Sequence, residues 1–134
     1  MRVLTALILF LFVQSAAAEL VKYKDLMEEM GLHFKNFAVS MQSGELQEED
    51  VKTIESLQRL MSRAAMEYPF SVDTDAHKIL YSELNIKSIH KALLLESAVK
   101  EVLSSEEQDL EKVRELFSEI NELRKHGHEE FKLD

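Results

Sequence analysis

The residues with the clearest chemical potential lie near the end of the chain, in the segment 123–132. This segment holds two imidazoles, His126 and His128, and three cations, Arg124, Lys125 and Lys132. Imidazole is a common ligand for transition metals and for haem iron, whereas a guanidinium suits carboxylates. The chain has no cysteine, so disulfides, thiolate metal sites and cysteine nucleophiles are excluded.

The spacing of the two terminal histidines limits the metal sites that they can form. On a helix, residues two apart point about 200° away from each other, so His126 and His128 cannot chelate one ion there. A histidine and a glutamate three or four residues apart share a helix face and can bind Zn²⁺ or Cu²⁺ at the surface. The pairs with this spacing are His126 with Glu129 or Glu130, and Glu29 with His33.

The composition of the chain predicts helix almost throughout. Only three glycines and one proline occur in 134 residues, and helix-favouring residues are abundant. We predict helices over about 20–42, 47–67, 77–103 and 105–131, with the third permitting a break near Asn85. Ser105, with Gln108 three residues later, forms a capping-box pattern that would start the fourth helix.

The apolar positions of the first predicted helix are spaced alternately by three and four residues. This spacing is the seam of a helix packed in a left-handed bundle. Gly44 follows as a left-handed helix cap, and Tyr68-Pro69 stops the second helix. The seam consists of Leu20, Tyr23, Met27, Met30, Phe34, Phe37 and Met41.

The other three helices each carry one apolar face. Together with short turns at residues 43–44 and 104–105, these faces predict an all-α protein, an antiparallel up-down-up-down four-helix bundle. The predicted inward positions are Val51, Ile54, Leu57, Met61 and Ala64 or Ala65 in the second helix; Leu84 or Ile86, Ile89, Leu93, and Val99 or Val102 in the third; and Leu110, Val113, Phe117, Ile120, and Leu123 or Arg124 in the fourth.

This topology brings two potential iron ligands to the same end of the bundle. Met27 lies near the start of the first helix and His128 near the end of the fourth. His128 follows Phe117 by eleven residues and Leu110 by eighteen, about three and five helical turns, so it should point inward. A thioether and an imidazole are the pair that holds a low-spin haem iron.

Several segments resemble the cytochrome c′ family. Residues 128–132, His-Glu-Glu-Phe-Lys, are similar to the end of the haem-attachment helix in that family, where the histidine follows a Cys-x-x-Cys pair. Here the two cysteine positions fall on Arg124 and Gly127. Lys-Tyr-Lys at 22–24, Met-Gly-Leu-His-Phe at 30–34 and Gly-Glu at 44–45 resemble the opening helix of the family.

The resemblance implies a haem site without the covalent link. It places Met27 over the distal haem face and His128 as the proximal ligand, as in soluble b-type four-helix cytochromes. Because both cysteines are absent, covalent haem c is excluded and haem b is expected. Arg124 and Lys125 are the candidate anchors for the haem propionates. The family also implies a homodimer formed through the first two helices, and a periplasmic redox partner.

The first eighteen residues predict export. Residues 1–18 contain an early cation at Arg2, an apolar run over 3–13 and three alanines at 16–18, the pattern of a secretory signal peptide. The mature domain would be 19–134 and periplasmic. Without Arg2 it would carry 15 basic and 25 acidic residues, a net charge of about −10, which disfavours nucleic acid and anionic membrane surfaces.

The expected function is therefore binding of non-covalent haem b for electron transfer or ligand sensing. The alternatives are a haem-free Cu or Zn bundle and a cofactor-free dimeric interaction module. We do not expect an enzyme, because the sequence has no phosphate loop, nucleophile elbow or His-Glu-x-x-His helix. The remaining methionines are expected to fill the core and two histidines to lie on the surface: Met30, Met41, Met61 and Met66, and His77 and His90.

Overall fold

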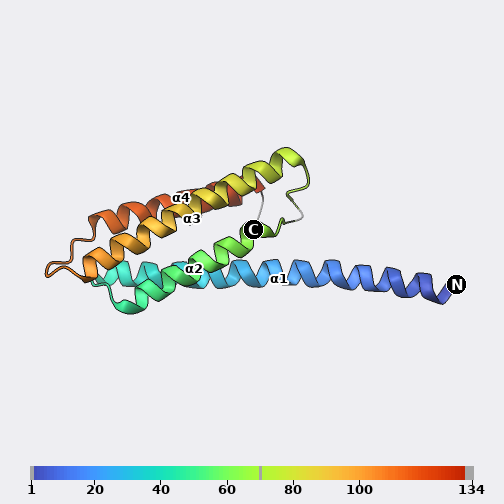
Figure 1. Cartoon of the computed structure of the whole chain (residues 1–134), viewed down its shortest axis with the longest axis horizontal. Helices are drawn as coiled ribbons and strands as arrows, with labels where there is room; N and C mark the ends of the chain where they lie inside the picture. Colours follow the sequence, from blue (N-terminus) through green and yellow to red (C-terminus); the bar gives the residue numbers. More distant parts are fainter. Residues whose placement is uncertain (1, 70, 132–134) are drawn as a thin grey trace.

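A computed structural model describes residues 2–69 and 71–131, with side chains from Tyr23 onward. The predicted all-α four-helix bundle is confirmed, and the described residues contain no strand. Each helix packs on the next along the chain (Figure 1). The helices are α1 (Arg2–Ser43), α2 (Glu48–Met66), α3 (Asp75–Leu103) and α4 (Glu111–Phe131).

The first helix is longer than the sequence pattern predicts. α1 begins at Arg2 rather than near residue 20, and its N-terminal part runs past the bundle in Figure 1. The predicted signal peptide falls in this part, and the side chains of residues 2–22, Leu20 included, lie outside the described set. Among the described residues, none of the helices is both long and apolar enough to cross a bilayer.

The two short connections meet at one end of the bundle, which we call the closed end (residues 44–47 and 104–110). Gly44 has a φ of 79°, the left-handed conformation that its sequence position predicts. The Gln108 side chain binds the Leu46 backbone twice, accepting from N–H at 2.9 Å and donating to C=O at 3.3 Å. The turn after α1 and the connection before α4 are thereby joined.

A single large core fills the bundle from the closed end to its middle. Phe37 is fully buried and its ring lies 4.9 Å from that of Phe117, which joins α1 to α4. The buried residues of this cluster are Phe34, Phe37, Met41, Leu46, Val51, Ile54, Leu57, Met61, Ala92, Leu95, Val99, Val102, Leu110, Val113, Leu116 and Ile120.

The start of the fourth helix differs from the prediction. α4 begins at Glu111, and the capping box at Ser105 and Gln108 does not form. The Ser105 hydroxyl donates to the Glu101 carbonyl at the end of α3, whereas Gln108 bonds across the bundle to Leu46. The helix start is instead supported by Asp109, whose side chain accepts from the Glu111 N–H at 3.0 Å.

The inward face of α3 also differs from the prediction in part. Leu84, Val99 and Val102 are buried as expected, but Ile86 is 63% exposed and Leu93 is 51% exposed. The small side chain of Ala92 and that of Leu95 occupy the core instead. The helix is also continuous at Asn85, whose amide donates to the carbonyl of Tyr81 one turn earlier and so adds to the helix rather than breaking it.

Candidate functional site

A cavity of about 70 Å³ lies at the opposite end of the bundle, the open end, where α2 ends, α3 begins and α4 ends. All four helices contribute to its wall, which is largely apolar and, among the residues whose side chains are described, includes no Asp or Glu. The lining residues are Tyr23, Met27, Met30, Phe34, Met61, Ala64, Tyr81, Leu84, Asn85, Ser88, Ile120, Leu123, Arg124, Gly127, His128 and Phe131.

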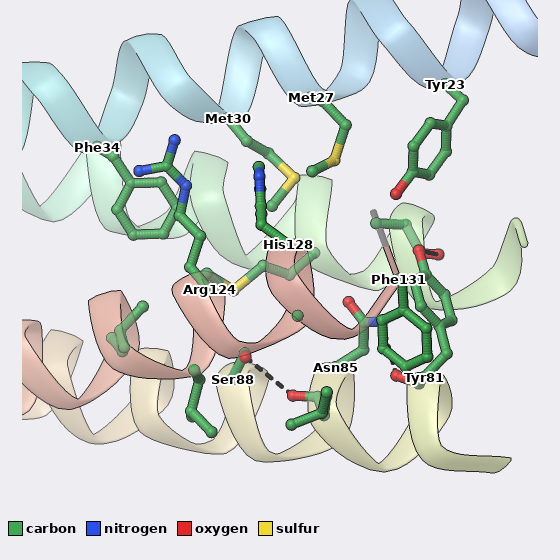
Figure 2. Close-up of a pocket in the computed structure, with 16 residues that line it drawn as sticks. Tyr23, Met27, Met30, Phe34, Tyr81, Asn85, Ser88, Arg124, His128 and Phe131 are labelled. Carbon is green, nitrogen blue, oxygen red and sulfur yellow. Dashed lines mark hydrogen bonds between the residues drawn. The ribbon is translucent and has the colours of Figure 1, made fainter. Parts of the chain in front are cut away.

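The two predicted iron ligands both line this cavity. Met27 comes from α1 and His128 from the last turn of α4, and Figure 2 shows their side chains extending toward the same space. Met30, one helical turn after Met27, also points toward His128 in Figure 2. Both methionines are half-buried. The juxtaposition predicted from the antiparallel topology is therefore present.

The two terminal histidines point in different directions, as the helix geometry predicts. α4 continues through Gly127 to Phe131, so the segment stays helical around both imidazoles. His128 is half-buried and its Nε2 atom is shielded from solvent. His126 is exposed and does not line the cavity. His126 and His128 therefore do not share a site.

Arg124 lies at the rim of the cavity and connects α4 to α1. Its guanidinium carbon is 5.0 Å from the centre of the Phe34 ring, a cation–π contact. On the outer side of Arg124 is a shallow depression, also lined by Asn121, Lys125 and His128. Two cationic side chains thus stand beside the opening, where a carboxylate on a ligand would be favoured.

A polar wall faces the methionines across the cavity. The Tyr81 hydroxyl donates to the carbonyl of Ala64 at 2.8 Å, which ties α3 to the last turn of α2. Asn85 and Ser88 each donate to carbonyls within their own helix, at 2.9 Å. The hydroxyl oxygen of Tyr23 is shielded from solvent and points into the cavity from α1 (Figure 2).

Burial changes the acid–base properties of two tyrosines at this end. It raises the pKa of Tyr23 far above the usual value of 10.0, and the neighbouring Tyr81 raises that pKa further. Burial is also the largest effect on the Tyr81 hydroxyl, and it raises the pKa of that group. Both phenols therefore stay neutral through the physiological range and act as hydrogen-bonding groups.

The surface metal pairs gain no further ligands in the structure. The described residues contain no cluster of three or more His, Cys, Asp or Glu side chains that could hold an ion. His33 is half-buried, with Glu29 exposed one turn before it. His90 is exposed as expected, whereas His77 is half-buried with its ring edge-on to Phe131 at 6.1 Å, so its assignment as a simple surface residue is wrong.

Sequence reasoning missed two of the methionines that line the cavity. The sequence predicts that Met30, Met41 and Met61 all fill the core. Met41 is buried in the core, whereas Met30 and Met61 line the cavity. Met30 follows Met27 by three residues on the same seam, and this spacing alone indicates a shared face. Met61 is 2% exposed and belongs to both the core and the cavity wall. Met66 is 84% exposed, so its assignment to the core is wrong.

Comparison with known proteins adds no relative. No family model, curated protein or solved structure matches this chain.

Proposed function

We propose that the open-end cavity binds haem b, with His128 and Met27 as the two ligands of the iron, for electron transfer or ligand sensing in the periplasm. The observation that carries this proposal is that Met27 on α1 and His128 on α4, which are far apart in the sequence, line the same cavity. In four-helix bundles, cofactor sites are built in this way, from side chains on facing helices. Haem, when bound, would supply a reversible Fe(III)/Fe(II) couple.

The residues around the cavity match the parts of a haem. Phe34, Leu84 and Leu123 give the wall an apolar surface suited to the macrocycle. Arg124 and Lys125, beside the rim, are positioned to pair with the two propionates. Neither propionate would need to enter the apolar interior, where an unpaired carboxylate is costly.

The volume of the cavity sets a condition on the proposal. At about 70 Å³ it is much smaller than the roughly 300–1,000 Å³ of typical cofactor pockets. Haem therefore requires α1 and α4 to move apart at the open end. The close helix packing runs from α1 to α2, α2 to α3 and α3 to α4. A separation of α1 from α4 would leave these three interfaces in place.

Haemin titration of the mature chain tests the proposal. We expect a 1:1 complex with the absorption spectrum of a low-spin b-type haem. His128→Ala should abolish binding, whereas the matched control His126→Ala, two residues away and exposed, should leave it unchanged. Met27→Ala should give a weaker, high-spin complex because the imidazole contributes most of the affinity for iron.

Two results would contradict the proposal. One is a broad spectrum of nonspecific association that His128→Ala does not alter. The other is haem that stays on the polypeptide through acid-acetone extraction after expression with a c-type maturation system. Such retention would require a covalent link, for which the chain has no cysteine.

A further inference from the structure

Three thioether sulfurs and one imidazole line the same small cavity. Met27 and Met30 come from α1, Met61 from α2 and His128 from α4. In Figure 2 the side chains of Met27 and Met30 both extend toward His128. Haem ligation uses only one of these thioethers, so it does not account for the grouping.

Thioether and imidazole donors select a particular kind of metal ion. Soft sulfur ligands favour Cu(I), whereas Mg²⁺, Ca²⁺ and Mn²⁺ require carboxylate, carbonyl or water oxygens. Among residues 23–69 and 71–131, no Asp or Glu lines the cavity. A dication would enter it without a compensating anion, and because the desolvation cost grows with the square of the charge, a monovalent ion is favoured.

The guanidinium of Arg124 at the cavity does not oppose this choice strongly. Arg124 is exposed, and its guanidinium stacks on the ring of Phe34 at the rim. Its charge is therefore largely screened by solvent. No lysine whose side chain is described lines the cavity itself.

The size of the cavity also suits an ion better than a macrocycle. Its volume of about 70 Å³ exceeds the roughly 10–15 Å³ that a cavity needs to hold one water molecule. A single metal ion can therefore be accommodated by side-chain rotation, and methionine, with three rotatable bonds, adapts readily. No separation of α1 from α4 is needed.

We propose that the haem-free protein binds one Cu(I) ion in this cavity, through Met27, Met30 and His128, with Met61 within the same wall as a further thioether. The proposal goes beyond haem binding and does not depend on it. Since Met27 and His128 are shared, Cu(I) and haem would exclude each other.

Anaerobic competition against a chromophoric Cu(I) chelator, using the haem-free mature chain, tests this assignment. We expect one Cu(I) per chain, and Ag(I), which does not change oxidation state, should compete for it. Met30→Leu should lower the Cu(I) affinity at least tenfold. The matched control is Met41→Leu, which removes a thioether of α1 buried at the closed end and should leave the affinity unchanged.

X-ray absorption at the copper edge gives a second measurement that needs no variant. Sulfur scatterers in the first coordination shell are expected. A shell of nitrogen and oxygen alone would overturn the proposal, as would the absence of stoichiometric binding or an affinity that neither Met27→Leu nor Met30→Leu changes.

The haem and copper proposals can fail separately because Met30 is a proposed metal ligand only in the second. If both are correct, Met30→Leu loses Cu(I) affinity but still gives the low-spin haem spectrum. Loss of Cu(I) binding in Met30→Leu with no haem binding by any form would leave copper as the ligand of the site. Haem binding without stoichiometric Cu(I) would leave only the proposed haem function.

Discussion

The two ends of the bundle differ in how completely they are packed. At the closed end one continuous core joins all four helices, and Gln108 links the two connections. At the open end the buried apolar residues form two small clusters, one around Tyr81 and Phe131 and the other around Leu26 and Leu60. The cavity lies at this end. We therefore expect the closed end to supply most of the stability, whereas the open end holds the cavity proposed as the binding site.

Two methionines on one helix illustrate the difference. Met30 and Met41 both belong to the predicted seam of α1. Met41 is 7% exposed and packs in the continuous core, whereas Met30 lines the cavity. The same residue type on the same face thus fills the core at one end and lines the cavity at the other.

The largest expected effect comes from matched truncations at the two ends. Phe37 and Phe131 are 0% and 2% exposed. Phe37→Ala should lower the free energy of unfolding by about 3–5 kcal/mol, because the surrounding close-packed core cannot collapse into the space. Phe131→Ala, at the end of α4 beside an existing cavity, should cost less, because the end of the helix can relax more easily. Urea unfolding of both variants measures the difference, and equal costs would contradict the division of roles.

A smaller effect is expected from the link between the two connections. Gln108→Ala removes both hydrogen bonds to the backbone of Leu46, which is a buried residue. We expect a loss of about 1–3 kcal/mol in the free energy of unfolding. The control is Glu107→Ala, an exposed neighbour in the same connection, which should stay within about 0.5 kcal/mol of wild type. Similar values for the two variants would mean that the link does not stabilise the closed end.

The smallest effect at neutral pH is expected at the open end, for Tyr23→Phe. Because the folded pKa of Tyr23 is raised, its contribution is fully present below about pH 10 and is lost as the pH rises above that, when only the unfolded chain ionises. The slope is at most about 1.4 kcal/mol per pH unit for each such tyrosine. Tyr23→Phe should match wild type within about 1 kcal/mol at pH 7 and lose less stability between about pH 10 and 11.

Thermal unfolding across the alkaline range measures this difference. Tyr68→Phe, which removes a hydroxyl from an exposed side chain, should follow the wild-type curve. If Tyr23→Phe also follows it, the Tyr23 hydroxyl is not held neutral in the folded protein.

Local sequence signals predicted most of the fold. α2 spans Glu48–Met66 against a prediction of 47–67, because an acidic start and the Tyr68-Pro69 stop act within a few residues. Asp50 accepts from the Gln47 N–H at 2.7 Å at this helix start. Gly44 adopts the left-handed conformation because it directly follows the end of α1, which is also a local signal. Met27 and His128 were placed at one end by helix periodicity and topology alone.

The errors came from interactions between residues distant in the chain. The motif at Ser105 and Gln108 predicted a local cap, but Gln108 bonds instead to Leu46, 62 positions earlier. Ile86 and Leu93 were expected in the core because they are large and apolar. The neighbouring helices of α3 instead approach the face that carries Ala92, since a small side chain permits close packing there.

By itself, the sequence determined the class of fold, the absence of thiolate chemistry and the end of the bundle where an imidazole and a thioether meet. These follow from composition and helix periodicity, which are properties of short segments. Only the tertiary structure decided that Met30 and Met61 share the cavity with His128, that Arg124 stacks on Phe34, and that His77 packs against Phe131. Such contacts depend on the distances and rotations between helices, which are set by the packing of the whole core.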